Sequence, residues 1–129
     1  MANKIVLADT SILIDYFRKK DKSKSALVLL YTQGYDFCIS AITEYEIYSG
    51  ATDNQIPYWQ DLLRKTEVIP FDKTIVSIAV TINKELKLKR KQIDIADLFI
   101  AATAITHDLP FATLNKNHFE RINDLKIIQ

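Results

Sequence analysis

Residues 5–11 read IVLADTS, a run of apolar residues that ends at an acid and two hydroxyl residues. The apolar residues are consecutive rather than alternating, as is typical of a strand buried on both faces of a parallel sheet. Similar short runs follow at 37–39, 68–69, 111–113 and 127–128. Longer stretches with helical patterning separate them, and this alternation predicts an α/β fold with a mostly parallel central sheet of four to five strands.

Six helices are expected between these strands. The last of them is apolar on nearly all sides and is therefore expected to lie buried. Gly34 is suited to follow the end of the second helix, and Asp72 is suited to cap the start of the fifth. The expected helices span 11–19, 23–33, 43–51, 54–65, 72–86 and 94–107.

The length and composition limit the class of protein. At 129 residues, the chain is expected to form a single domain over 1–129. Its single cysteine, Cys38, cannot form an internal disulfide, and we expect it in the core of a protein from a reducing compartment. No apolar run approaches the ~20 residues that cross a bilayer, so we expect a cytoplasmic protein without a membrane partner.

The net charge gives no sign of a nucleic-acid-binding protein, because 17 basic residues nearly balance 16 acidic ones. The basic residues are nevertheless clustered, first at 18–24 and again just before the last helix, at Lys87, Lys89, Arg90 and Lys91. Either cluster taken alone is explained equally well as an ordinary solvated surface.

Acidic and polar residues follow the expected strands, where open parallel sheets bind their ligands. Asp9 follows the first strand and Asn115 the fourth, although Asp9 is also a suitable helix N-cap. Asp97 lies in the first turns of the most apolar helix, where a buried carboxylate must be neutralised, paired with a cation or bound to a metal. Asp94, one turn earlier, is suited to cap that helix or to support Asp97. Two further acids, at 44 and 46, point in different directions, and local arguments do not choose between them.

Four segments together resemble PIN-domain proteins, in particular the VapC-type toxins. They occur in the family's order and span nearly the whole chain: DTSILIDY at 9–16, ISAITEYEIYSGA at 39–51, DIADLFIAATAI at 94–105 and LPFATLNKNHF at 109–119. The resemblance implies a three-layer α/β/α domain. It also implies that Asp9, Glu46 and Asp97 are the catalytic acids, because Glu46 stands four residues before a glycine, as the family's glutamate does, whereas Glu44 does not.

The resemblance further implies a Mg²⁺ site, with Mn²⁺ as a substitute. Asp9 and Asp97 match the family's main ligands, and Glu46 matches a ligand that acts directly or through water. Asn115 stands where many relatives carry Asp, so it is expected to be an auxiliary ligand, and the number of metal ions is left open. Supporting positions around the metal are expected for Thr10, Ser11, Asp94 and Thr113.

The implied activity is that of an endoribonuclease toxin that cleaves tRNA or rRNA and is inhibited by a cognate antitoxin. The basic strip at 87–91 would then hold the RNA backbone, and His118 would have a structural role. The family also implies a homodimer. Tyr58, Trp59 and Leu62 are suited either to that interface or to the core.

Two other functions are compatible with the sequence. A phosphorelay receiver domain has a similar size and sheet, with Asp72 as its phosphoacceptor, but it requires two adjacent acids where this chain has Asp9 and Thr10. A non-catalytic PIN-like module that binds RNA or protein is the other alternative, because Asn115 replaces an acid.

Overall fold

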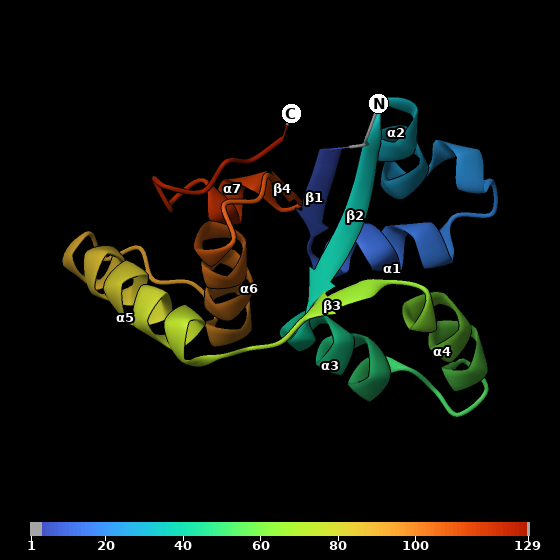
Figure 1. The fold of residues 1–129 in the computed structure, drawn as a ribbon, viewed down its shortest axis with the longest axis horizontal. Helices are drawn as coiled ribbons and strands as arrows, with labels where there is room; N and C mark the ends of the chain where they lie inside the picture. Colours follow the sequence, from blue (N-terminus) through green and yellow to red (C-terminus); the bar gives the residue numbers. More distant parts are fainter. Residues whose placement is uncertain (1–3, 129) are drawn as a thin grey trace.

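The computed structural model describes residues 4–128 and has a parallel sheet at its centre (Figure 1). The sheet has four strands in the order β3-β2-β1-β4, and each neighbouring pair is parallel. This confirms the expected parallel sheet. The strands are β1 (Lys4–Ala8), β2 (Tyr35–Ser40), β3 (Glu67–Ile69) and β4 (Phe111–Ala112).

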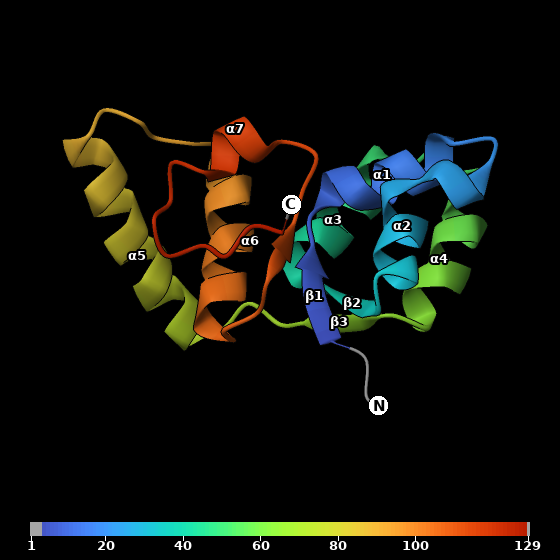
Figure 2. The same cartoon turned by 90° about the horizontal axis from the view of Figure 1, so that it is seen from above.

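Helices cover both faces of the sheet, which gives the expected three layers (Figures 1 and 2). On one face lie α1 (Thr10–Arg18), the 3₁₀ helix η1 (Lys22–Lys24), α2 (Ala26–Thr32), α3 (Ala41–Gly50) and α4 (Ile56–Arg64). On the other face lie α5 (Lys73–Leu88), α6 (Ile95–Thr106) and the short α7 (Lys116–Phe119).

The central strand β1 explains why its apolar residues are consecutive. Leu7 packs into the core on the α5 and α6 side of the sheet, whereas Val6 and Ala8 pack into the core on the α1 to α4 side. All three side chains are fully buried. A strand that is covered by helices on both faces needs apolar residues at successive positions.

Two expected elements differ in the structure. The predicted strand at 127–128 is reduced to a single bridge between Ile127 and Phe111. The predicted helix 23–33 is interrupted at Ser25, which is fully buried. The hydroxyl of Ser25 accepts from the backbone N–H of Val28 and donates to the carbonyl of Lys22, so it ends η1 and begins α2.

Other local predictions are confirmed. Gly34 has a φ of 89° directly after the end of α2, and the carboxylate of Asp72 accepts from the N–H of Ile75 at the start of α5. Cys38 is buried. Trp59 is buried against Phe17, which makes it a core residue and not part of an exposed dimer surface.

Within 4–128, no helix is both long enough and apolar enough to span a bilayer.

We expect Ser25→Ala to lower the free energy of unfolding by about 1 kcal/mol, because it removes the N-cap of α2 and a bond to the end of η1. Urea denaturation measures this change. Ser23→Ala is the matched control, because Ser23 is exposed and its hydroxyl bonds only to Asp21. Equal stability of the Ser25 variant and the wild type would show that the interruption does not depend on this hydroxyl.

Candidate active site

Asp9 lies at the carboxyl end of β1 and is the N-cap of α1, as expected. Its side chain is only 3 % exposed, yet it accepts several hydrogen bonds. Ser11 donates to Oδ1 at 2.5 Å, the N–H of Ile12 donates to the same oxygen at 3.4 Å, and Thr113 donates to Oδ2 at 2.6 Å. Burial raises the pKa of Asp9 above its ordinary value, and these hydrogen bonds lower it only in part.

The two hydroxyls that donate to Asp9 also accept hydrogen bonds from the loop after β4. Ser11 Oγ accepts from the N–H of Leu114 at 3.0 Å, and Thr113 Oγ1 accepts from the N–H of Asn115 at 2.9 Å. Each hydroxyl therefore joins the carboxylate to the backbone of residues 114–115. The supporting positions predicted for Ser11 and Thr113 are contacts with Asp9 in the structure.

Glu46 reaches the same region from α3. Its Oε1 accepts from the hydroxyl of Thr10 at 2.6 Å, and the Oγ1 atoms of Thr10 and Thr43 are 3.1 Å apart. Thr10 is the first residue of α1, directly after Asp9. Thr10 thus fixes the glutamate from α3 beside the end of β1.

Asp97 lies in the first turn of α6, and its side chain is 24 % exposed. Burial raises its pKa; the neighbouring His118 opposes this effect, while the negative charges of Asp94, Glu46 and Asp9 add to it. His118 Nδ1 lies 3.0 Å from Asp97 Oδ2. Asp94 occupies the N-cap position but makes no capping hydrogen bond with its side chain, so its effect on Asp97 is through charge.

Asp9, Glu46 and Asp97 line one open hollow of about 640 Å³. Arg18 and Lys19 from the end of α1 line it as well. A second hollow of about 620 Å³ adjoins it, and the two share Asp97, Leu114 and Asn115. The residues of the first hollow that bear on the chemistry are Asp9, Thr10, Ser11, Glu46, Asp97 and Asn115.

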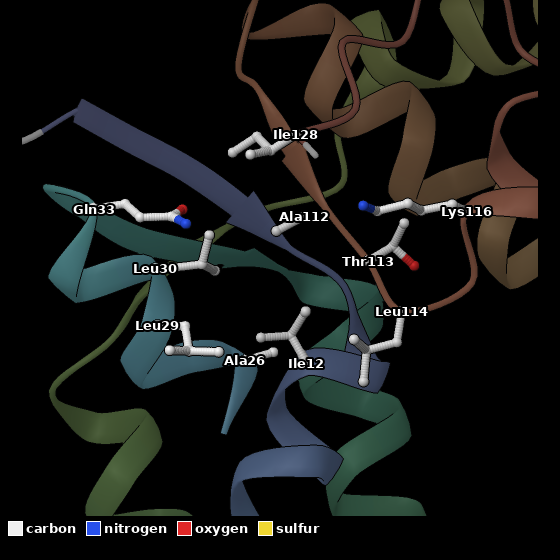
Figure 3. A pocket seen from close by; sticks show the side chains of 10 residues that line it. All are labelled: Ile12, Ala26, Leu29, Leu30, Gln33, Ala112, Thr113, Leu114, Lys116 and Ile128. Carbon is white, nitrogen blue, oxygen red and sulfur yellow. The ribbon is translucent and has the colours of Figure 1, made fainter. Parts of the chain in front are cut away.

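Leu114 also lines a separate, mainly apolar pocket (Figure 3). It is lined mainly by aliphatic side chains from α1, α2, β4 and the C-terminal segment, and its volume is about 180 Å³. It contains none of the three acids.

The donor set of the acidic hollow fits a hard cation such as Mg²⁺, because it consists of carboxylate and amide oxygens. Within the described residues, however, no three His, Cys, Asp or Glu side chains are close enough together to hold one metal ion directly. Mg²⁺ usually keeps several waters and takes only one or two protein carboxylates. These side chains would therefore suit a largely hydrated ion that takes few protein oxygens directly.

Comparison with known proteins agrees with this fold. Residues 6–125 match the PIN domain. The chain belongs to the PIN-domain family. It is 35 % identical to ribonuclease VapC1 of Methanocaldococcus jannaschii over 120 residues, which cover 92 % of this chain and 82 % of that protein.

Solved structures of toxin–antitoxin complexes have the same fold. A toxin–antitoxin complex from Klebsiella pneumoniae matches this PIN domain with a TM-score of 0.75 and 29 % identity, over 93 % of this chain and 94 % of that chain. DNA-bound VapBC from Salmonella typhimurium matches with a TM-score of 0.82 and 25 % identity, over 98 % and 97 % of the two chains. The chain is thus similar to the VapC proteins over almost its whole length.

Family membership excludes the receiver-domain alternative. In this PIN domain, Asp72 is the N-cap of α5 and is not among the residues of the acidic hollow. Glu44, the other acid of the α3 segment, does not line the hollow either, whereas Glu46 does. The structure thus separates the two glutamates as the resemblance implied.

The basic strip is only partly placed as expected. Arg90 and Lys91 line a third hollow with Arg121, and this hollow meets the second one at Asn117. Lys87 and Lys89, at the end of α5, are exposed and are not among the residues of that hollow. We call these three adjoining hollows the groove: Arg90 and Lys91 line it, whereas Lys87 and Lys89 do not.

His118 contacts Asp97 at the edge of the hollow, and the sequence did not predict this contact. The structural role that we expected for His118 stays a prediction. A local signal was present, because His118 lies five residues after Thr113 in the same segment. Nothing in the sequence pattern, however, indicates that this side chain reaches α6. The sequence indicated Arg18 and Lys19 only as members of a basic cluster, yet they line the acidic hollow.

We expect Asp97→Asn to raise the metal-free stability at pH 7. The pKa of Asp97 is raised by folding, so its protonated form contributes stability below the ordinary value of 3.8, and this contribution is lost as the pH rises through the folded pKa. An amide avoids that loss at neutral pH. In urea denaturation at pH 7, the variant should have a larger free energy of unfolding than the wild type. Near pH 3 this difference should shrink. Asp53→Asn, at an exposed site, is the control, and an equal gain there would contradict the explanation.

Proposed function

We propose that this protein is a Mg²⁺-dependent endoribonuclease whose catalytic acids are Asp9, Glu46 and Asp97. The observation that supports it most is that three carboxylates from different elements line one open hollow at the carboxyl end of the sheet. Burial and mutual repulsion make such a cluster costly without a cation. The names of the VapC relatives support the same reaction class.

Each residue has a proposed role. Asp9 and Asp97 bind the metal, Glu46 binds it through water and accepts a proton, and Asn115 is an auxiliary oxygen ligand. Bound Mg²⁺, or Mn²⁺ in its place, lowers the pKa of a water and neutralises charge on the phosphate. Asp9 is preoriented by Ser11 and Thr113, so it needs no rearrangement to bind a cation.

RNA is negatively charged and must approach an acidic hollow. Basic residues that line the adjoining hollows would attract its phosphates. Arg18 and Lys19 stand at one end of the groove, and Arg90 and Lys91 stand at the other. Backbone contacts of this kind position a substrate without reading its sequence. The family resemblance points to tRNA or rRNA as the substrate.

The biological role that we propose is that of the toxin in a toxin–antitoxin pair in the cytoplasm. A cognate antitoxin would inhibit the enzyme by covering the acidic hollow, and the toxin would be a homodimer. The structural likeness to toxin–antitoxin complexes supports a partner of this kind.

The first test is made in cells, because it requires no knowledge of the substrate. Wild type and Asp9→Asn are induced separately, and new RNA 5′ ends are mapped across the transcriptome. We expect new ends and growth arrest with the wild type, and a loss of at least about 100-fold in cleavage with the variant, because a ligand carboxylate is lost. Folded protein is checked for both by circular dichroism.

The same experiment distinguishes the enzyme from the non-catalytic module. Identical transcriptomes for folded wild type and variant, in cells without an antitoxin, would overturn the nuclease proposal. Binding of RNA or protein without cleavage would then support the module that Asn115 makes conceivable.

The basic residues of the groove give a further prediction. We expect the double variant Arg90→Ala, Lys91→Ala to weaken RNA binding and to reduce the salt-dependence slope by about 1.4, because each lost phosphate contact on a single strand changes it by about 0.7. Fluorescence anisotropy over a range of salt concentrations measures this slope. Lys87→Ala, Lys89→Ala removes the same charge outside the groove and is the matched control. Equal slopes for the two double variants would contradict the proposed contact.

A further inference from the structure

The segment from Thr113 to His118 reaches two acids of the site from one side. The hydroxyl of Thr113 donates to Oδ2 of Asp9 at 2.6 Å, and Nδ1 of His118 lies 3.0 Å from Oδ2 of Asp97. Asp9 begins α1 on one face of the sheet, whereas Asp97 belongs to α6 on the other face. One short segment thus contacts two carboxylates from separate layers.

The segment is braced internally and anchored in the core. The N–H of Asn115 donates to Thr113 Oγ1, and the N–H of His118 donates to the carbonyl of Asn115 at 3.0 Å. The next residue, Phe119, is fully buried and packs on Phe111, with ring centroids 4.7 Å apart. The backbone between Thr113 and His118 is therefore held in place.

We infer that His118 is a positioning residue that holds Asp97 at a fixed distance from Asp9 through the contact between its Nδ1 and Oδ2 of Asp97. The inference rests on the proposed function, because this distance matters only if both carboxylates serve one metal ion. His118 itself contacts neither the metal nor the RNA in this role. Hydrogen-bond partners of metal-binding side chains typically contribute about 10–100-fold in metal affinity.

A purely structural role for His118 makes a different prediction. The two side chains are 33 % and 24 % exposed, and a partly exposed pair of this kind stabilises a fold only modestly. Its loss would then change the stability of the metal-free protein and leave metal affinity as it was. Metal affinity and metal-free stability are therefore the two quantities to compare.

Two substitutions distinguish the position of the donor atom at residue 118. In His118→Asn, the amide N–H lies close to the position of Nδ1, whereas in His118→Gln it lies one carbon further out, near the position of Nε2. His118→Leu removes the donor altogether. The matched control is His107→Leu, because His107 is exposed and lies at the opposite end of α6.

The experiment measures the Mn²⁺ dissociation constant of each full-length variant by electron paramagnetic resonance, together with the metal-free free energy of unfolding in urea. We expect His118→Asn and His107→Leu to bind Mn²⁺ as the wild type does. His118→Gln and His118→Leu should bind it about 10–100-fold more weakly. If the Leu variant does not fold, the Asn and Gln pair decides the question.

The other outcomes are distinguishable. Wild-type affinity in every His118 variant would overturn the inference and leave the proposed metal site intact. Equal weakening by Asn and Gln would also overturn it, because the loss would then follow the ring and not the donor at Nδ1. Failure of the wild type to bind Mn²⁺ would overturn both this inference and the proposed metal site.

Discussion

The buried carboxylate of Asp9 is the interaction on which the rest of this structure depends. Its burial is unfavourable for a charge, and the hydroxyls of Ser11 and Thr113 offset part of that cost. Because the same hydroxyls accept from the backbone at 114–115, the groups that solvate the carboxylate also fasten the end of β4 to the start of α1. One set of hydrogen bonds thus both stabilises the buried carboxylate and connects α1 to the loop after β4.

The acidic hollow is a compromise between stability and affinity for a cation. Burial raises the pKa of Asp97, and the nearby charges of Asp94, Glu46 and Asp9 add to this effect, so the metal-free fold carries some electrostatic repulsion at neutral pH. A cation that binds the folded state alone removes that repulsion and stabilises the fold by mass action. The hydroxyls of Thr10, Ser11 and Thr113 fix two of the acids in advance, so little of the binding energy is needed to arrange them.

Local patterns predicted most of the fold because they report local physics. The consecutive apolar residues of β1 indicate burial on both faces, and Asp72 and Gly34 mark helix ends through hydrogen bonds and backbone angles within a few residues. The break at Ser25 was not predicted, since the helical pattern continues across it and only the burial of its hydroxyl reveals it. Asp9 and Asp97 were indicated by their places after a buried strand and in an apolar helix, and the resemblance chose Glu46 over Glu44. The contact of His118 with Asp97 depends on how α7 packs against α6, which no local pattern encodes.

The bond between Thr113 and Asp9 joins residues 104 positions apart, and this separation has a consequence for biosynthesis. A nascent chain that ends just before β4 already contains all three acids, three of the four strands and the helices α1 to α6. It lacks the hydroxyl that orders the first acid. Translation adds about 5–20 residues per second, so most of the polypeptide can fold on the ribosome while the site is still incomplete. The ordered site is therefore acquired last, and an mRNA cut short upstream of β4 would yield a protein with the acids but without their arrangement.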